Sequence, residues 1–366
     1  MKTVVLFAVF VYATITQSVV TAALIGLGDL PGDTYLSAAY GVNNNGQVVG
    51  RAQSSNGIEA FLWTNGGGMV GLGDLSGGNF LSIANAINGS GQVVGQASGT
   101  NGTEAFIWDN VNGMQALGDL PGGNYYSVAM GINNAGQVVG QSSSAVGNVP
   151  FIWDAVNGMR VIGSLGGDGW GAARSINDNG YVVGWSNSTN GTEAFIWNSN
   201  LNNPMAGLGD LSGGSFYSEA FSVNEHNQVA VYSLGALGGE AAIWNSANGL
   251  QGIGELPGGD YYSVAQSINE QGQIVGWSSS AESGSAYKEG FFWDPEYGMQ
   301  ALGDLSGGIF NSSAKALNDL GQVVGGSSGA FGSEAFITQS SVPEPSSLLL
   351  WGTGLLSLLL FRWFRH

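Results

Sequence analysis

Short hydrophobic runs alternate with clusters of glycine, asparagine and serine along the whole central part of the chain. One stretch shows the pattern clearly, with hydrophobic segments at Ser127–Ile132, Gln137–Ser142, Val149–Trp153 and Met159–Leu165. Their lengths and the turn residues between them predict four short β-strands. Neighbours such as Val138 and Val139 are both hydrophobic, so the segments do not alternate strictly. Such strands are typical of sheets that are covered on both faces.

The same pattern recurs seven times, and this repetition is the main organising feature of the chain. The motif Gly-Asp-Leu-Pro-Gly-Gly and its variants place one equivalent position in each unit, at Asp29, Asp74, Asp119, Ser164, Asp210, Glu255 and Asp304. Consecutive units are separated by 45, 45, 45, 46, 45 and 49 residues. A four-stranded repeat of this length matches the blade of a β-propeller.

An asparagine occupies one fixed place in every unit, three residues before a turn residue. These asparagines are Asn43, Asn88, Asn133, Asn177, Asn224, Asn269 and Asn318. The turn residue is glycine in six units and Asn227 in the remaining one. Asparagine accepts backbone hydrogen bonds at the first position of a turn, and glycine, or asparagine as next best, adopts positive φ. The pattern predicts a hairpin turn whose asparagine is structural rather than catalytic.

The order of the strands bears on whether the repeats close into a ring. A lone fourth strand, at residues 25–30, precedes the first complete set, and the last unit stops after its third strand at residues 335–338. A ring closes if that first strand completes the last sheet, which removes the exposed edges of an open array. An open β-solenoid is the alternative, and it would require distinct capping units. We therefore expect an all-β, seven-bladed β-propeller over residues 24–338.

Composition and charge restrict the partners and the chemistry. Residues 24–342 contain 25 acidic and 5 basic residues, a net charge of −20, so we expect no nucleic-acid partner. Cysteine is absent, which excludes disulfides and thiolate metal sites. The 63 glycines disfavour long amphipathic helices.

The N-terminus carries the features of a secretory signal peptide. Lys2 is followed by an uncharged hydrophobic run over residues 4–15 and by small residues that end near Ala22 and Ala23. Residues 1–23 are therefore predicted to be removed on export. An uncleaved anchor helix is the alternative, but the run is short for a bilayer.

The C-terminus combines a proline motif, a hydrophobic segment and basic residues. Pro343, Glu344 and Pro345 lie in a predicted linker over residues 339–346, and a segment over 347–366 follows. Its fourteen mostly hydrophobic residues, 348–361, would form a helix of about 21 Å, which is short for a hydrocarbon core of about 30 Å. Physical reasoning alone gives a marginal membrane segment, or a plain tail anchor.

These three parts, in this order, resemble the PEP-CTERM sorting signal of Gram-negative bacteria. The resemblance implies recognition by an exosortase, a membrane protease-transpeptidase. It also implies a transient anchor in the inner membrane and delivery to the cell surface or the exopolysaccharide matrix.

The repeats resemble the bacterial extracellular HAF-repeat family through their Gly-Asp-Leu, Ile-Asn and Gly-Gln-Val-Val-Gly elements. The resemblance covers nearly the whole predicted domain and implies an extracytoplasmic repeat protein. The histidine that gives the family its name is replaced by Glu59, Glu104, Val149, Glu193, Glu240, Glu289 and Glu334. No role that requires imidazole is therefore carried over.

Two sets of equivalent acidic residues are the first candidate site. One set contains Asp29, Asp74, Asp119, Asp210, Glu255 and Asp304, and the other contains the six glutamates that replace the family histidine. A circle of equivalent carboxylates would favour Ca²⁺, the one cofactor that the sequence suggests. The favoured alternative is that each aspartate caps its own glycine-rich turn through backbone N–H groups.

Aromatic residues just after the same loops are the second candidate site. All seven units carry one, namely Tyr35, Phe80, Tyr125, Trp170, Phe216, Tyr261 and Phe310. They would either form a ligand-binding rim that stacks on sugar rings or, as the favoured alternative, pack in the core between blades. The third-strand tryptophans, such as Trp153, are expected in the core.

No catalytic arrangement is evident in the sequence. His226 and His366 are the only histidines, so neither a Ser-His-Asp triad nor a histidine-rich zinc site can be built. We therefore expect a non-enzymatic surface or matrix protein, with polysaccharide binding as the sharper hypothesis. A propeller glycan lyase or hydrolase that uses loop carboxylates is one alternative. A purely structural matrix protein without a ligand is the other.

Overall fold

The computed structural model describes residues 23–32, 35–200, 204–281 and 284–338. The predicted signal peptide, apart from Ala23, and the predicted linker and sorting segment over 339–366 lie outside the described residues. Across the described ranges, no helix is long and hydrophobic enough to cross a membrane.

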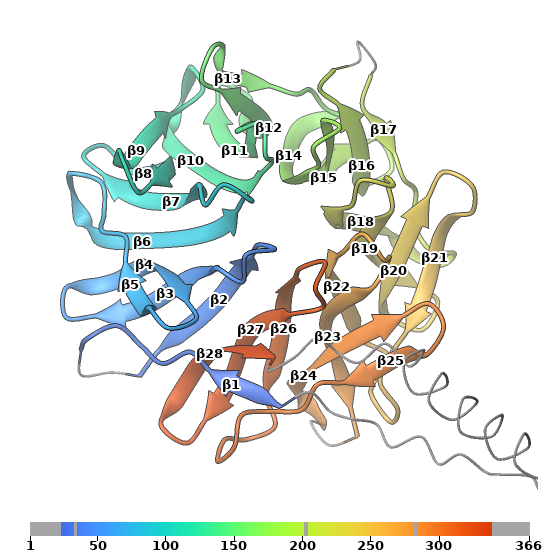
Figure 1. Cartoon of the computed structure of the whole chain (residues 1–366). Helices are drawn as coiled ribbons and strands as arrows, with labels where there is room; N and C mark the ends of the chain where they lie inside the picture. Colours follow the sequence, from blue (N-terminus) through green and yellow to red (C-terminus); the bar gives the residue numbers. More distant parts are fainter. Residues whose placement is uncertain (1–22, 33–34, 201–203, 282–283, 339–366) are drawn as a thin grey trace, which may run out of the picture.

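The described residues form 28 strands, arranged as sheets around a central axis (Figure 1). The first four blades contain β2 (Ser37–Val42), β3 (Val48–Ser54), β4 (Gly57–Thr64) and β5 (Gly68–Gly71); β6 (Gly77–Ile87), β7 (Val93–Gly99), β8 (Thr103–Asp109) and β9 (Gly113–Gly118); β10 (Gly122–Ile132), β11 (Val138–Ser144), β12 (Gly147–Asp154) and β13 (Gly158–Val161); and β14 (Gly166–Ile176), β15 (Tyr181–Ser188), β16 (Thr192–Asn198) and β17 (Ala206–Gly207).

The remaining blades follow the same order of strands. They contain β18 (Gly213–Val223), β19 (Val229–Gly235), β20 (Gly239–Asn245) and β21 (Gly249–Gly254); β22 (Ser263–Ile268), β23 (Ile274–Ser280), β24 (Gly284–Asp294) and β25 (Gly298–Ala301); and β26 (Ser312–Leu317), β27 (Val323–Gly329) and β28 (Gly332–Thr338) with β1 (Leu24–Gly26). Consecutive strands within a blade pair antiparallel, and the first strand of each blade lies nearest the axis. The structure is a β-propeller, as the sequence predicted.

The last blade is completed by the first strand of the chain. β1 pairs antiparallel with β28, and Ile25 lies opposite Ile337 in the register. The two ends of the repeat region are thus hydrogen-bonded in one sheet, which removes two exposed edges. This pairing confirms the predicted ring closure and rules out the open β-solenoid.

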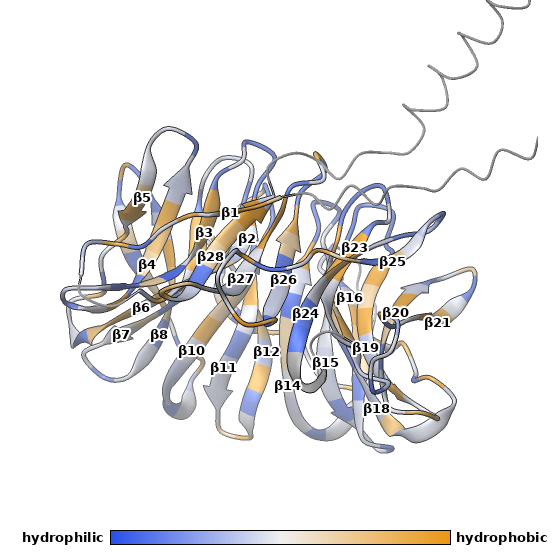
Figure 2. Ribbon diagram, turned by 90° about the horizontal axis from the view of Figure 1, so that it is seen from below, coloured by the Kyte–Doolittle hydropathy of each residue, from blue (hydrophilic) through white to orange (hydrophobic). Residues whose placement is uncertain are grey.

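The hydrophobic core lies between adjacent blades rather than in one central mass. One cluster joins Val94 and Ala105 of the second blade to Ala129, Val138 and Phe151 of the third. Sheets packed in this way carry hydrophobic residues on both faces. Hydrophobic residues, coloured orange, recur along the strands in the side view (Figure 2). The largest fully buried side chains are six phenylalanines, at 61, 106, 151, 195, 291 and 336.

The predicted core role of the third-strand tryptophans needs correction. Trp153 is only partly buried and packs against the edge of the cluster that Phe151 occupies. Phe151, two residues before Trp153, points into the gap between blades, where its phenyl ring fills the space.

The asparagine turns have the predicted geometry. Asn133 Oδ1 accepts the backbone N–H of Gln137 at 2.9 Å, and the backbone N–H of Gly136 donates to the carbonyl of Asn133. Gly136 has φ 76°, and Asn227, which replaces glycine at this place, has φ 59°. The turn chemistry deduced from the sequence is confirmed.

Each turn asparagine also contacts the next blade, which local turn chemistry did not predict. Its Nδ2 donates to the backbone carbonyl of the equivalent asparagine one blade further on, at 2.9–3.4 Å. The last of these bonds runs from Asn318 back to Asn43, so seven hydrogen bonds form a closed circle. All seven side chains are at most 5% exposed. We call this circle the asparagine ring.

Breaking one member of the asparagine ring should destabilise the whole fold. Asn133→Ala removes the amide that bonds Asn177 and leaves buried backbone groups without partners, at a cost of about 1–3 kcal/mol. Chemical denaturation of the variant measures the loss. The matched control is Asn112→Ala, because Asn112 lies in an exposed turn, and a surface change there costs within about 0.5 kcal/mol. Equal losses for the two variants would contradict a special role of the ring.

Candidate functional site

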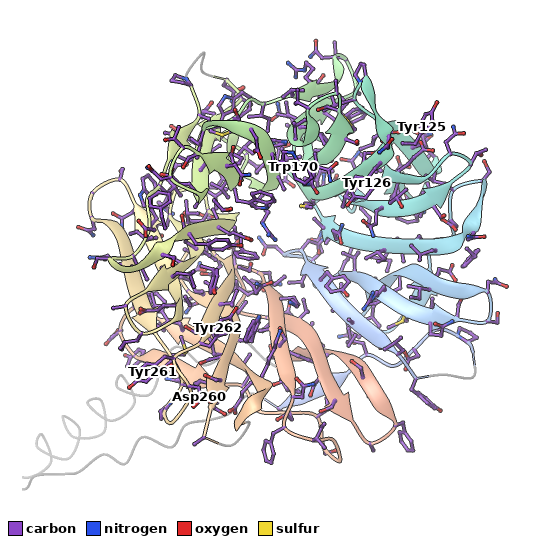
Figure 3. All side chains as sticks on the ribbon, turned by 180° about the vertical axis from the view of Figure 1, so that it is seen from behind. Tyr125, Tyr126, Trp170, Asp260, Tyr261 and Tyr262 are labelled. Carbon is purple, nitrogen blue, oxygen red and sulfur yellow. The ribbon has the colours of Figure 1, made fainter. Side chains whose placement is uncertain are left out.

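The predicted aromatic rim lies on the face that carries the loops from one blade to the next, here called the loop face. The opposite face carries the asparagine turns and is called the turn face. Tyr35, Tyr125, Trp170, Tyr261 and Phe310 are 46–63% exposed, and Phe80 and Phe216 are half-buried. Figure 3 shows Tyr125 and Tyr261 on opposite sides of the ring. For these five residues, the expectation of core packing is wrong.

Close contact with the preceding blade holds the aromatic positions. The hairpin between the second and third strands of that blade passes directly beneath them. A Cβ atom on Gly102 would lie 2.2 Å from the carbonyl oxygen of Tyr125, and one on Gly147 would lie 2.4 Å from the indole nitrogen of Trp170. Only glycine permits this approach, and Gly147 also has φ 115°.

The tips of the same hairpins add exposed hydrophobic side chains that the sequence analysis missed. Val146, Leu237 and Phe331 are all strongly exposed. The ring centroids of Phe331 and Tyr35 lie 5.5 Å apart, so a hairpin tip and a rim aromatic share one surface. Their sequence signal was present, since each is a hydrophobic residue in a turn otherwise rich in small residues.

A cavity opens beside the rim in two equivalent gaps between blades. In the gap after the second blade it measures about 420 Å³ and is lined by Glu104, Asp119 and Tyr125, together with glycine backbone. In the gap after the fifth blade a cavity of about 180 Å³ is lined by the equivalent Glu240, Glu255 and Tyr261. We call these two sites the gap cavities. Both predicted candidate sets therefore meet in one place.

Four of the glutamates, Glu59, Glu193, Glu240 and Glu334, accept a backbone N–H from the loop that ends a blade. Glu59 Oε1 accepts the backbone N–H of Gly73 at 3.0 Å, and Glu240 Oε1 accepts that of Gly254 at 3.1 Å. Gly71 leaves room for this side chain, because a Cβ there would lie 2.2 Å from Glu59 Oε1. The repeated glycine two residues before the Gly-Asp pair therefore has a steric reason.

The aspartates brace the following loop, as the turn-capping interpretation predicted. Asp74 Oδ2 accepts the backbone N–H of Leu81 at 2.7 Å, seven residues further on. Asp29 does the same for Leu36 at 3.1 Å. Asp304 likewise accepts the backbone N–H of Asn311, so these three carboxylates tie the start of a glycine-rich loop to the start of the next blade.

The acidic positions do not converge into one circle of charge. Each aspartate or its equivalent lies beside the glutamate of its own gap; Glu334 accompanies Asp29, and Glu59 accompanies Asp74. In the parts of the chain that the structure describes, no three histidine or carboxylate side chains are grouped so as to hold a metal ion. Asp210 and Asp304 occupy the same loop position as the others.

The carboxyl groups in the gaps are partly dehydrated. Burial raises the pKa of Asp29, Asp74, Asp119 and Glu255, and the neighbouring glutamate adds to the rise for Asp29, Asp74 and Glu255. One buried oxygen each of Asp29, Asp119 and Glu255 has no hydrogen-bond partner. Burial without a partner is a further reason why the neutral form of these carboxyl groups is favoured.

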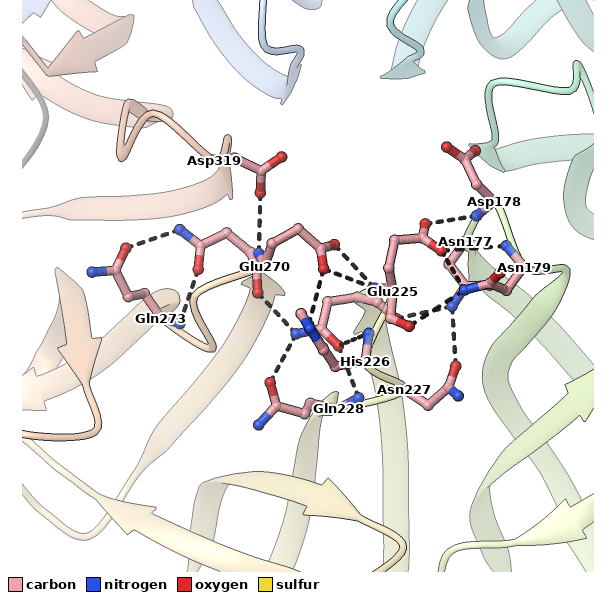
Figure 4. A network of polar contacts seen from close by, with 12 residues as sticks. Asn177, Asp178, Asn179, Glu225, His226, Asn227, Gln228, Glu270, Gln273 and Asp319 are labelled. Atoms are coloured by element: carbon pink, nitrogen blue, oxygen red, sulfur yellow. Dashed lines mark hydrogen bonds and ion pairs between the residues drawn. The ribbon is translucent and has the colours of Figure 1, made fainter.

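Two further features were missed by the sequence analysis. A row of carboxylates, Asp178, Glu225, Glu270 and Asp319, follows the asparagine ring on the turn face, where each accepts a backbone N–H from the preceding turn (Figure 4). His226 Nδ1 lies 3.2 Å from Glu270. A cavity on the central axis is the second feature.

No family model and no curated protein matches this sequence. Among solved structures, TolB from Acinetobacter baumannii is similar at 12% identity and a TM-score of 0.45, over 80% of this chain and 79% of that one. A gluconolactonase from Xanthomonas campestris is similar at 11% identity and a TM-score of 0.40, over 86% and 89%. A mutant of AofleA from Arthrobotrys oligospora is similar at 13% identity and a TM-score of 0.41, over 76% and 89%. We transfer no function from them.

The dehydrated carboxyl groups should make the protein more stable in mild acid. A native-state pKa raised above the ordinary aspartate value of 3.8 means that the folded chain binds more protons than the unfolded chain, so stability falls as pH rises through the raised pKa. We expect a higher melting temperature at pH 5 than at pH 7. Asp109, whose pKa is lowered by its hydrogen bonds to Asn112, stays ionised at pH 5 and does not oppose this.

Asp119→Asn isolates the effect, because an amide keeps one acceptor oxygen and has no charge. This variant should show a smaller difference between the two pH values than the parent chain. Asp109→Asn is the control and should leave the difference unchanged. A melting temperature that falls from pH 7 to pH 5 in the parent chain would contradict the interpretation.

Proposed function

We propose that this protein is a non-enzymatic, multivalent polysaccharide-binding propeller that uses the gaps on its loop face. The observation that supports this most is an exposed aromatic ring beside a carboxylate-lined cavity, found in two gaps three units apart. Aromatic faces stack on the apolar faces of sugar rings, and carboxylates accept hydrogen bonds from hydroxyl groups. Exposed hydrophobic patches on a protein surface commonly mark such binding sites.

The chemistry of one gap cavity illustrates the proposed contact. Tyr125 supplies the ring, and Asp119 and Glu104 supply two carboxyl groups that line the cavity. The cavity falls within the size range of small-ligand sites, about 300–1,000 Å³. Because the described residues hold no group of three carboxylate or histidine side chains placed to bind a metal, a bound Ca²⁺ would need sugar oxygens to complete its coordination.

Repetition suits weak binding to a long polymer. Several equivalent sites on one rigid ring raise the effective concentration of the next site once the first is occupied. Affinity then accumulates without one tight pocket.

A glycan lyase or hydrolase is the less favoured function. The carboxylates recur in six of seven units and serve to hold backbone N–H groups. Catalysis in a repeat protein usually depends on one unit that differs from the others, whereas these carboxylates recur at equivalent positions.

The proposal includes an extracytoplasmic location. The predicted signal peptide, the HAF-like repeats and the PEP-CTERM-like tail with Pro343, Glu344 and Pro345 all support export to a cell surface or polysaccharide matrix. A membrane-bound exosortase is then the expected processing partner.

Substitution of the rim aromatics should abolish retention without unfolding the protein. The combined change Tyr125→Ala, Trp170→Ala and Tyr261→Ala removes three exposed rings, so each should cost within about 0.5 kcal/mol of stability. Retention on a column of matrix polysaccharide should fall at least tenfold. Phe151→Ala is the control for core packing and should cost about 3–5 kcal/mol. If the triple variant unfolds as readily as this control, the rim is part of the core and the proposal fails.

Processing at the C-terminus is tested separately. In a host that carries an exosortase, mass spectrometry of surface material should recover peptides that end near Pro343–Pro345. Recovery of peptides that continue through residues 348–366 would contradict processing.

A further inference from the structure

The cavity on the central axis is built from one residue of each first strand. Its lining includes the seven equivalent positions Tyr40, Asn85, Met130, Arg174, Phe221, Gln266 and Lys315, and its volume is about 400 Å³. We call it the axial cavity. The turn asparagines are identical in all seven units, whereas these positions differ in every unit. The repeat symmetry is therefore lost where the side chains of all seven blades meet.

Positive charge is concentrated around the axial cavity, although the repeat region is strongly acidic. Residues 24–342 contain five basic residues. Arg174 and Lys315 line the cavity. Lys288 lies close enough for its positive charge to lower the pKa of Lys315. The guanidinium carbon of Arg51 lies 6.0 Å from the centre of the Tyr40 ring. Four of the five bases are thus in or beside one cavity, a distribution that net composition does not explain.

Lys315 has no carboxylate partner among the residues that the structure describes. Its Nζ lies 3.4 Å from Gln266 Oε1, a neutral acceptor. Burial, together with the positive charges of Lys288 and Arg174, lowers the pKa of Lys315 to about 8. Placing an ammonium group there is unfavourable unless an anion joins it.

Arg174 is held in place by its neighbours. Its guanidinium pairs with Glu219, which also accepts the hydroxyl of Tyr217, and lies 4.3 Å from the centre of the Phe221 ring. The carboxylate of Glu219 partly offsets the positive charge of Arg174 and holds its guanidinium in place. Lys315 therefore supplies the uncompensated charge in the cavity.

The remaining lining groups fit a polar ring compound. Asn85, Gln96 and Gln266 provide amide donors and acceptors, and Tyr40 and Phe221 provide aromatic faces. Hydroxyl groups and one apolar ring face would find partners here. Entry is favoured from the loop face, because the turn face carries the carboxylates Asp178, Glu225, Glu270 and Asp319, which repel anions.

We propose that the axial cavity binds a carboxylate-bearing sugar residue, such as a uronate, with the carboxylate at Lys315. This inference deepens the proposed polysaccharide binding by naming a substrate class for a second, asymmetric site. The gap cavities are lined by carboxylates and hold hydroxyl groups, whereas the axial cavity selects negative charge. The two kinds of site together would favour an acidic polysaccharide over a neutral one.

The test is calorimetric titration of the complete chain with D-glucuronate, D-glucose and acetate as separate probes. Glucuronate should bind, while glucose and acetate should bind at least tenfold more weakly, because each lacks either the carboxylate or the ring. Lys315→Gln should weaken glucuronate binding at least tenfold. Glutamine is tolerated at this place, since the preceding blade has Gln266 at the equivalent position. Arg160→Gln, at an exposed base far from the axis, is the matched control and should change nothing.

A pH series separates a binding role of Lys315 from a merely structural one. The charged and titratable groups around it are Arg174, Glu219, Lys288, Arg51 and Tyr40. Since the pKa of Lys315 is lowered to about 8, glucuronate binding should decline as the pH rises above 8. Lys315→Arg keeps the charge at high pH, so its binding should persist there.

The outcomes distinguish this proposal from the proposed function. If glucuronate does not bind, or binds unchanged to folded Lys315→Gln, the axial site is overturned. Equal binding of glucose and glucuronate would overturn the selection of a carboxylate. If retention on polysaccharide depends on rim residues such as Tyr125 but not on Lys315, the gap cavities bind the polymer and the axial cavity does not contribute. Loss of retention in the triple variant of Tyr125, Trp170 and Tyr261 with glucuronate binding intact is expected, because the two kinds of site are separate.

Discussion

The asparagine ring is the constraint on which the rest of this propeller depends. Each buried amide holds its own turn through Oδ1 and the next blade through Nδ2, so one side chain fixes both the hairpin and the position of its neighbour. A buried amide without hydrogen-bond partners costs about 1–3 kcal/mol of folding free energy. Any arrangement of blades that breaks the asparagine ring is therefore disfavoured. Together with the pairing of β1 and β28, the ring makes the seven units mutually dependent.

Much of this architecture could be predicted from the sequence, because it depends on residues that lie close together in the chain. The 45-residue repeat, the turn at Asn133 and the displaced first strand each follow from residues close together in the chain. The bond from Asn133 to Asn177 could not be predicted, since its partner lies 44 residues away and depends on how blades pack. The exposure of Tyr125 was misjudged for the same reason.

The sequence contains one signal that the two acidic positions form a common site, and the sequence analysis did not use it. The unit that has Ser164 in place of the aspartate is also the unit that has Val149 in place of the glutamate. Joint loss of two positions fits groups that act together, as the pairs of Glu59 with Asp74 and Glu240 with Glu255 do in the structure. The axial positions gave no such signal, because seven different residues at one place resemble noise until the ring brings them together.

The molecule has two kinds of candidate binding surface, one that follows the sevenfold repeat and one that does not. The gaps repeat one arrangement of ring and carboxylates, whereas the axial cavity collects what differs between blades. The central claim is that the repeated gaps are separate binding sites. Native mass spectrometry of the protein with a soluble oligosaccharide from the matrix polymer tests it most directly. The account predicts a series of complexes that carry more than one ligand per chain, whereas a series that stops at a single ligand, or no complex at all, would contradict it.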